Sequence, residues 1–265
     1  MIEKESTEFW DVTSIKIAII GSGVMGKGIR DFLDSRGIKV DLLSARSLLE
    51  SASSFSEQLA TYDLIIESCL EDIRTKESIL KIVSQINTKG IIGTGTSSIS
   101  VSELQNSVEN PKRFCGIHFM NPPRAISVVE LIAGSQTSKQ ALEITKKLLL
   151  DLEREVFEIL DSPGFAVNSI LVSMLNQAVY TLEASGLEPR ELDLIIKKTT
   201  GLKLGPLATI DLIGVDVTVK IIENMHESNP QNFLPPASKL QKMLEGGKLG
   251  RKTKIGFFDY PSVMV

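Results

Sequence analysis

An apolar segment that leads directly into a glycine-rich turn constrains this chain more than any other feature. Residues 14–20, SIKIAII, form an apolar run of strand length. Such runs are typical of parallel strands that are covered on both faces. The run ends at GSGVMGKG, and the next residues place Ile29, Phe32 and Leu33 at helical spacing before a closing glycine. This order predicts a strand, a glycine turn and a helix, the first unit of an open α/β sheet.

The same alternation continues through the first 160 residues. Apolar runs indicate strands, and segments with apolar residues three to four positions apart indicate helices. The further predicted strands are 38–43, 63–68, 91–96, 114–119, 126–132 and 155–160, and the further predicted helices are 73–87 and 138–152. The predicted fold class is therefore α/β, with an N-terminal Rossmann-type doubly wound parallel sheet over residues 1–160.

Strand alternation ceases after the turn DSPG at residues 161–164. The segments that follow with helical spacing are 165–186, 191–201, 207–226 and 237–247. We therefore expect an all-helical C-terminal domain over residues 161–265. Its first and third helices carry more apolar surface than about a hundred residues can bury, which predicts a homodimer formed through this domain.

Composition narrows the class of protein. The 265 residues are 42% apolar and carry a net charge of −4 with both signs interspersed, so nucleic acid is not an expected partner. Cys69 and Cys115 form no CxxC pair and indicate a reduced compartment, and no metal site is expected. The first 13 residues lack the apolar core of a secretion signal, and no run approaches the length of a membrane span. We expect a cytoplasmic protein that acts on a small molecule.

The glycine turn has the spacing G-x-G-x-x-G at Gly21, Gly23 and Gly26. The first glycine permits a tight turn, the second lets a pyrophosphate approach the backbone, and the third lets the helix pack closely on the strand. Because the motif follows a predicted strand and opens a predicted helix, it predicts a dinucleotide site. The expected contact residues of this turn are Gly21, Ser22, Gly23, Val24, Met25 and Gly26.

The end of the second predicted strand carries Ser44 and Arg46, where an acid would bind the ribose 2′-hydroxyl. A hydroxyl and a guanidinium can instead accept a 2′-phosphate. Alternatively, Arg46 only begins a solvated helix, and the sequence leaves both interpretations open. We therefore expect NAD or NADP as cofactor, with NADP at least tolerated.

Motifs along residues 15–260 resemble those of the L-3-hydroxyacyl-CoA dehydrogenase family. They stand in the family's order and read GSGVMGKGI, IIESCLEDIRTKESIL, TSSISVSEL, RFCGIHFMNPP, VVELIAG, DSPGFAVN, GPLATIDLIGVD and GRKTKIGFFDY. The resemblance implies a Rossmann domain followed by a helical substrate and dimerisation domain. It also implies hydride transfer between a nicotinamide cofactor and a 3-hydroxyacyl-CoA, with a short acyl chain expected.

The resemblance assigns four catalytic residues. Ser97 matches the serine that hydrogen-bonds the reacting oxygen, and His118 matches the general base. Glu130 matches the carboxylate that orients this base, and Asn168 matches the amide that helps to hold the substrate carbonyl. Oxidation of a secondary alcohol requires such a base, and a histidine beside a carboxylate supplies it. His118 can also be read as a structural histidine at a strand end.

Further matches lie on the cofactor side. The resemblance assigns cofactor contacts to Glu71 and Lys76, to Asn121 of the HFMNP motif, and to Lys252. Two serines have a second interpretation, because Ser97 and Ser98 can cap a helix that starts near residue 101. The sequence favours a structural role for Glu67, at a strand end, and for His226.

The chain also departs from the family pattern. Gly95 replaces the Asn of NTSS, Ser169 the Arg after PGFxVN, Ala208 the Glu of GPFEL, and Lys254 the second Gly of GRKTG. Only about twenty residues separate the second strand from the third, where the family carries a helical hairpin that helps to bind coenzyme A. Two alternatives therefore stay open beside the main hypothesis: a dehydrogenase of a 3-hydroxy acid without coenzyme A, and a non-catalytic nucleotide-binding protein that retains the fold.

Overall fold

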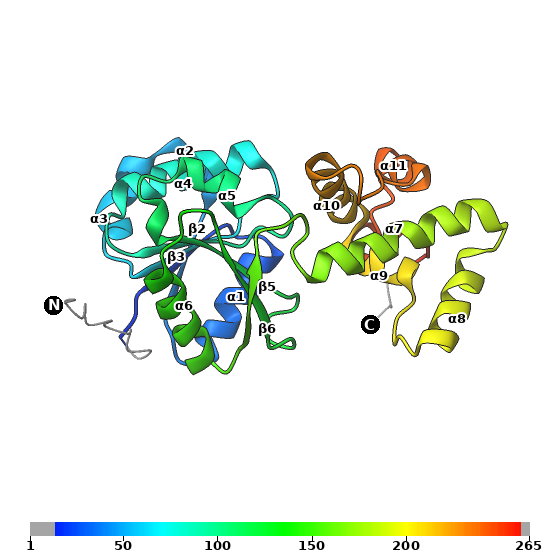
Figure 1. Ribbon diagram of the computed structural model, residues 1–265, viewed down its shortest axis with the longest axis horizontal. Coiled ribbons are helices and arrows are strands. Elements are labelled where there is room, and N and C mark those ends of the chain that lie inside the picture. Colours follow the sequence, from blue (N-terminus) through cyan, green and yellow to red (C-terminus); the bar gives the residue numbers. More distant parts are fainter. Residues whose placement is uncertain (1–13, 261–265) are drawn as a thin grey trace. The chain divides into compact units, whose positions relative to one another are not determined.

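The computed structural model describes residues 14–260, which divide after Ser162 into two compact units (Figure 1). The division falls within the DSPG turn. The expectation that the first 13 residues carry no secretion signal concerns a segment outside the described residues.

The first unit is built on one seven-stranded sheet in the order β2-β1-β3-β4-β5-β6-β7. The strands are β1 (Ile17–Ile20), β2 (Val40–Leu43), β3 (Leu64–Glu67), β4 (Ile91–Thr94), β5 (Phe114–Phe119), β6 (Val128–Ala133) and β7 (Glu155–Leu160). The chain runs from β1 outward to β2 and then returns to β3 on the other side of β1. This reversal confirms the predicted doubly wound fold and places a topological switch point between β1 and β3.

The last two strands differ from the predicted parallel sheet. Strands β1 to β5 are parallel, but β6 pairs with β5 in the antiparallel direction, and β7 runs parallel to β6. Only residues 120–127 connect β5 to β6. A parallel strand needs a crossover of a dozen or more residues, so this short connection forces the chain to turn back.

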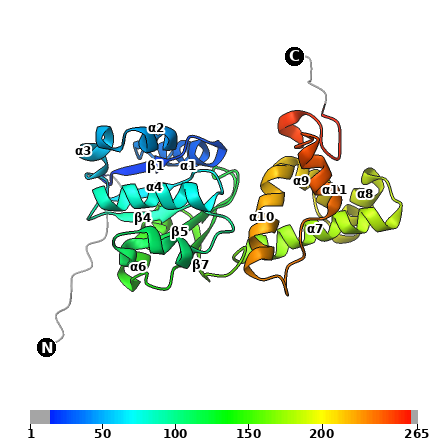
Figure 2. The same cartoon turned by 90° about the horizontal axis from the view of Figure 1, so that it is seen from above.

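Helices cover both faces of the sheet (Figures 1 and 2). On one face lie α1 (Val24–Asp34) and α6 (Lys139–Asp151), whose apolar residues join those of the strands in a buried core. The other face carries α2 (Ala45–Glu50), α3 (Ser56–Leu59), α4 (Ile73–Ile86) and α5 (Val101–Leu104). Short 3-10 turns are η1 (Ala52–Phe55), η2 (Gln105–Ser107) and η3 (Pro111–Arg113). This double cover explains why β1, β3 and β4 are apolar without alternation.

The second unit contains helices joined by loops, and its described residues form no β-strand beyond isolated bridges at Gly250, Ile255 and Asp259. Its elements are α7 (Val167–Ser185), α8 (Pro189–Thr200), α9 (Pro206–Ile213), α10 (Val215–Ser228), α11 (Ser238–Glu245) and the 3-10 turn η4 (Arg251–Thr253). Their inward apolar residues form a separate core that includes Leu175, Ile210 and Ile222. The prediction of a single helix over residues 207–226 is wrong, because Gly214 adopts φ +108 and ends α9 before α10 begins.

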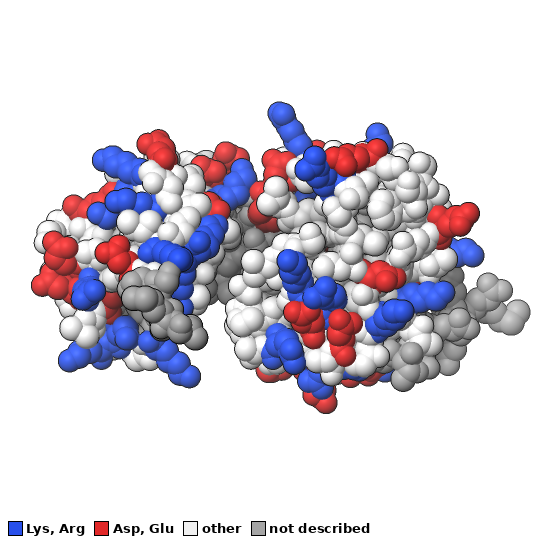
Figure 3. Space-filling model, turned by 180° about the vertical axis from the view of Figure 1, so that it is seen from behind, with Lys and Arg blue, Asp and Glu red and all other residues white. Residues whose placement is uncertain are grey.

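The surface of the described residues carries mixed charge. On the face of the first unit that Figure 3 shows, acidic and basic side chains are interspersed. No helix within residues 14–260 is long and apolar enough to cross a bilayer. Within the same range, no group of three or more His, Cys, Asp or Glu side chains is arranged to hold a metal ion.

Candidate active site

The turn between β1 and α1 presents open backbone at the carboxyl edge of the sheet. Gly21 has φ +121, and a methyl group there would lie 2.2 Å from the carbonyl oxygen of Ser68. A methyl group at Gly26 would lie 1.8 Å from the carbonyl oxygen of Gly21. Close packing therefore requires glycine at both positions. Gly23 is different, because a methyl group there would meet nothing within 4 Å.

This turn fits a dinucleotide pyrophosphate. Gly23 is exposed, and no side chain caps the N-terminus of α1, so the first amides of the helix face the open side of the turn. Ser22 is exposed, and Val24 is 76% exposed. Met25 is half-buried and packs against the core, which gives it a structural contact besides the predicted cofactor contact.

The end of β2 forms the start of a solvated helix. The Ser44 hydroxyl accepts a hydrogen bond of 3.3 Å from the amide of Ser47 and so caps α2. The Arg46 side chain is 87% exposed and pairs with Glu50 one helical turn later, at 2.8 Å. The structure thus shows the solvated helix that the sequence allowed, and the guanidinium of Arg46 stays accessible from solvent.

A group of three largely buried charged side chains lies at the end of β3. Lys76 of α4 is 1% exposed, and its Nζ donates to the two carboxylate oxygens of Glu67 at 2.9 and 3.1 Å. The same Nζ lies 3.4 Å from Oε2 of Glu71. Burial disfavours the ammonium, but the charges of Glu67 and Glu71 raise the pKa of Lys76 overall. Lys76, expected at the cofactor, therefore has its ammonium inside the first unit, between two carboxylates.

The Glu71 carboxylate holds the turn that follows β4. Its Oε1 accepts hydrogen bonds from the Thr96 hydroxyl at 2.7 Å, the Ser97 amide at 2.8 Å and the Ser98 amide at 2.9 Å. The hydroxyls of Ser97 and Ser98 also donate to it, at 3.2 and 2.9 Å. Burial opposes ionisation of Glu71, but the Lys76 charge and these hydrogen bonds lower its pKa to about 2.

The interpretation of Ser97 and Ser98 as caps of the helix near residue 101 is wrong. Ser100 caps α5, because its hydroxyl accepts a hydrogen bond from the Glu103 amide at 3.2 Å. Asp161 adds a second cap, since its carboxylate accepts hydrogen bonds from the amides of Val101 and Ser102 at 3.1 and 2.7 Å. Ser97 and Ser98 are thus engaged by Glu71 instead.

His118 and Glu130 face each other across the β5–β6 pair. The two residues are direct partners in the antiparallel register, and His118 Nδ1 lies 2.7 Å from Glu130 Oε2. Their side chains are only 9% and 2% exposed. A charge-assisted hydrogen bond in such a buried setting fixes the orientation of the imidazole ring. This is the arrangement in which a histidine serves as a general base.

The connection after His118 is tied to the rest of the first unit by Arg154. This buried guanidinium donates to the carbonyl oxygens of Pro123 and Ile126 at 3.1 and 3.2 Å. It also lies 4.1 Å from the ring centre of Phe32 in α1. Asn121 of the HFMNP motif is exposed at the start of this connection. Sequence reasoning missed Arg154, because nothing in DLEREV shows which of its charges turns inward.

The first unit thus brings together the glycine turn, Ser97, Glu71 and the His118–Glu130 pair at one sheet edge. Two further predicted site residues, Asn168 and Lys252, belong to the second unit. Asn168 is buried in the first turn of α7, and Lys252 of η4 forms an ion pair with Asp216 at the start of α10.

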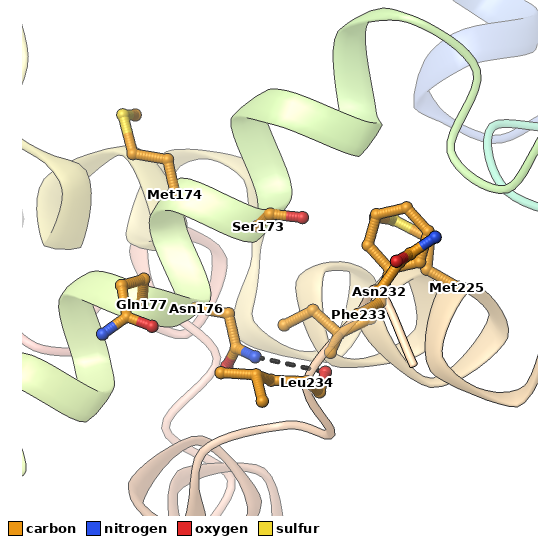
Figure 4. A pocket seen from close by; sticks show the side chains of 9 residues that line it. Ser173, Met174, Asn176, Gln177, Met225, Asn232, Phe233 and Leu234 are labelled. Carbon is orange, nitrogen blue, oxygen red and sulfur yellow. Dashed lines mark hydrogen bonds between the residues drawn. The ribbon is translucent and has the colours of Figure 1, made fainter. Parts of the chain in front are cut away.

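A separate hollow of about 330 Å³ lies within the second unit (Figure 4). It is lined by α7, α10 and the segment before α11, with Ser173, Met174, Met225 and Phe233 among its walls. The Asn176 amide donates to the carbonyl oxygens of Leu234 and Pro235, at 3.5 and 2.8 Å, and so fixes one side of the hollow.

Two family models cover most of the chain. The model described as 3-hydroxyacyl-CoA dehydrogenase, NAD binding domain matches residues 44–162, and the model described as 3-hydroxyacyl-CoA dehydrogenase, C-terminal domain matches residues 164–260. This chain belongs to the 3-hydroxyacyl-CoA dehydrogenase family. Membership confirms the resemblance and makes the chain an oxidoreductase with an NAD-type cofactor. The glycine turn precedes the matched residues of the first model, so its assignment rests on the geometry above.

Individual members of the 3-hydroxyacyl-CoA dehydrogenase family match nearly the whole chain. The 3-hydroxybutyryl-CoA dehydrogenase of Clostridioides difficile is 33% identical, over 93% of this chain and 99% of its own. The crystal structure of FadB2 from M. tuberculosis has a TM-score of 0.85 at 26% identity, covering 92% of this chain and 98% of its own. That of (S)-3-hydroxybutyryl-CoA dehydrogenase PaaH1 from Ralstonia eutropha has a TM-score of 0.82 at 29% identity, with 93% and 99% covered.

One similar structure is named for a substrate of a different chemical class. The 5-formyl-3-hydroxy-2-methylpyridine 4-carboxylic acid 5-dehydrogenase, described as an NAD+ dependent dismutase, has a TM-score of 0.73 at 26% identity. The match covers 93% of this chain and 91% of that protein.

Proposed function

We propose that this protein interconverts a short 3-hydroxyacyl-CoA and the corresponding 3-ketoacyl-CoA by hydride transfer to and from NAD. The observation that carries the proposal is the buried His118–Glu130 pair, with its 2.7 Å contact at the sheet edge that also carries the glycine turn. Relatives named 3-hydroxybutyryl-CoA dehydrogenase over nearly the whole chain support the substrate class.

Different residues of the chain accept the substrate proton, stabilise the resulting charge and hold the substrate. Because Nδ1 of His118 is directed at Glu130, Nε2 is the nitrogen that takes the proton of the substrate hydroxyl. The Glu130 carboxylate stabilises the imidazolium that results. Ser97 holds the reacting oxygen, and the resemblance to the family assigns Asn168 to help hold the substrate carbonyl. When bound, NAD supplies the hydride acceptor, and the open backbone at Gly23 would hold its pyrophosphate.

Reduction of acetoacetyl-CoA by NADH, followed through nicotinamide absorbance, tests this function. We expect turnover with the CoA thioester, and free acetoacetate offered alone serves as the matched comparison. Turnover of free acetoacetate at a similar kcat/KM would favour a 3-hydroxy acid dehydrogenase that does not require coenzyme A. That second candidate is favoured by the short segment between β2 and β3, which holds only α2, η1 and α3. Cofactor binding without any turnover would favour the non-catalytic alternative.

For the cofactor, we propose that NADP(H) is tolerated beside NAD(H). No carboxylate stands at Ser44 to repel a 2′-phosphate, and the Arg46 guanidinium is exposed nearby in the sequence. The same assay with NADPH, repeated with Arg46→Ala, measures this. If NADPH is used far more slowly than NADH, and Arg46→Ala changes neither rate, Arg46 is only a surface charge of α2.

We further propose a homodimer formed through the helical unit. Several apolar side chains of this unit are exposed, among them Ile170 at 74%, Leu212 at 54% and Leu234 at 55%. Light scattering at micromolar concentration gives the mass directly. A dimer for the wild type and a monomer for Ile170→Lys are expected, and a monomeric wild type would contradict the proposal. We also propose the cytoplasm as the location, which fractionation of the native cell checks.

A further inference from the structure

The Glu71 carboxylate contacts both the backbone and the side chain of Ser97, the candidate catalytic serine. One oxygen of the Glu71 carboxylate accepts from the amide and from the hydroxyl of Ser97, at 2.8 and 3.2 Å. The same oxygen accepts from the residues on either side, Thr96 and Ser98. A single carboxylate oxygen thus fixes the backbone of this turn and contacts the Ser97 hydroxyl.

The Glu71 carboxylate is itself held in place by neighbouring charged residues. Lys76 approaches its other oxygen to 3.4 Å and is held in place by both oxygens of Glu67. Glu67 is held in turn by the Thr94 hydroxyl, which donates at 2.7 Å, and by the Cys69 amide, which donates at 2.6 Å. The three charges therefore form a chain that starts in the strands β3 and β4 and ends at Ser97. None of these contacts requires a bound ligand.

Gly95 increases the importance of this support. It directly precedes the turn and has no side chain that could hold it, whereas the family pattern has an Asn at this position. A methyl group at Gly95 would lie 3.1 Å from the carbonyl oxygen of Glu67. The conformation of residues 96–98 is therefore held by Glu71 from outside the turn and by the Thr96 hydroxyl within it, which accepts from the Ile99 amide at 3.0 Å.

We propose that Glu71, held by Lys76 and Glu67, is the positioning residue that orients Ser97 toward the reacting oxygen of the substrate. The inference rests on the function proposed above. Glu71 fixes the backbone of residues 96–98 and so sets where the Ser97 side chain starts. The Ser97 hydroxyl makes the longest of the five contacts to the Glu71 oxygen, at 3.2 Å, and can rotate from it to donate its proton to the reacting oxygen. The Glu71 side chain is 18% exposed, and its two oxygens face the serine turn and Lys76. Positioning of the turn and contact with the cofactor are therefore two distinct roles for it.

Kinetics of Glu71→Gln separate these roles. The amide keeps the size of the side chain but loses the charge that binds the amides and hydroxyls. We expect kcat for acetoacetyl-CoA to fall roughly 10- to 100-fold, less than the loss of a whole transition-state donor. The Kd for NADH, measured by fluorescence titration, should stay within about twofold. Glu57→Gln, which removes the same charge from the exposed surface of α3, should change neither value.

A double-variant cycle shows whether Glu71 acts through Ser97. If it does, Glu71→Gln should add little to the loss caused by Ser97→Ala, because the group that it orients is already gone. Additive losses would overturn the inference, and so would a weakened Kd for NADH with an unchanged kcat, which marks a cofactor contact.

Glu67→Gln provides a second route if Glu71→Gln does not fold. Glu67 reaches the serine turn only indirectly, through Lys76 and Glu71 and through the Thr94 hydroxyl, which accepts from the Thr96 amide at 3.3 Å. Its kcat loss should therefore have the same direction but be smaller. An unchanged kcat in both variants of an active wild-type protein would refute the positioning role. An inactive wild type would instead refute the proposed function and would remove the positioning role with it.

Discussion

Replacement of Lys76 by Met should destabilise the first unit strongly. The substitution keeps the apolar stem but removes an ammonium that lies 2.9 Å from Glu67 and 3.4 Å from Glu71. Removal of one partner from a buried ion pair costs about 3–5 kcal/mol, because the remaining charge stays desolvated. Here one cation serves two carboxylates, so we expect the free energy of unfolding to fall by an amount in the upper half of this range.

The pH dependence of this loss has a definite sign. Burial disfavours the charged form of Glu71, but Lys76 and the hydrogen bonds of the serine turn lower its folded pKa from 4.5 to about 2. A lowered folded pKa stabilises the protein above pH 4.5, and this contribution disappears as the pH falls toward 2. Without Lys76, burial dominates and the carboxylates take up protons more readily. The deficit of the variant should therefore be largest near pH 7.5 and smaller at pH 5.

Urea unfolding followed by circular dichroism at these two pH values measures the effect. With an m value of about 2 kcal/mol/M, the midpoint of the first unit should fall by about 2 M at pH 7.5. Lys81→Met is the matched control, because Lys81 lies on the same helix and is exposed. A midpoint within about 0.3 M of the wild type, or a larger deficit at pH 5 than at pH 7.5, would refute the reasoning.

Three further outcomes are expected. His118→Gln should keep NADH binding, measured by titration, and lose roughly two to four orders of magnitude in kcat; near-normal turnover would make His118 structural. Gly26→Ala should lower the melting temperature, because its methyl group would lie 1.8 Å from the Gly21 carbonyl oxygen. Gly23→Ala should keep the wild-type melting temperature and weaken NADH binding. Equal melting temperatures of the two variants would contradict this. Burial raises the pKa of the Cys115 thiol to about 12, so maleimide should label it only after unfolding, and rapid labelling of the native protein would contradict its burial.

Local patterns were sufficient for most elements of the first unit. The apolar runs around Ile19, Ile65 and Ile92 each became a buried strand, because a strand covered on both faces leaves a continuous apolar run in the sequence itself. Strand direction leaves no such signal. The run that became β6 reads the same in either direction, and only the short connection before it decides that it turns back.

The contacts of the site were harder to predict, because they depend on residues distant in sequence. Any serine hydroxyl of the stretch SSIS can cap a following helix. Two of these serines, Ser97 and Ser98, bind the distant Glu71 instead. Lys76 lies on the buried face of α4, three and four residues before Ile79 and Leu80, and nothing local in the sequence shows that Glu67 and Glu71 pair with its ammonium there. The His118–Glu130 pairing followed from the resemblance, since twelve residues of separation do not by themselves imply contact.

The register of the β5–β6 pair makes the contact between His118 and Glu130 sensitive to where the chain changes in length. His118 and Glu130 meet because they are opposite each other in an antiparallel ladder, not because the connection between them has a particular length. Insertions within residues 120–127 can therefore accumulate without separating the two side chains, provided that the loop keeps its anchors. A single insertion inside either strand, between these residues and the loop, would turn one of the two side chains to the opposite face of the sheet. Among natural or engineered descendants of this protein, length variation should thus be found in the loop and be absent from the strand ends beside it.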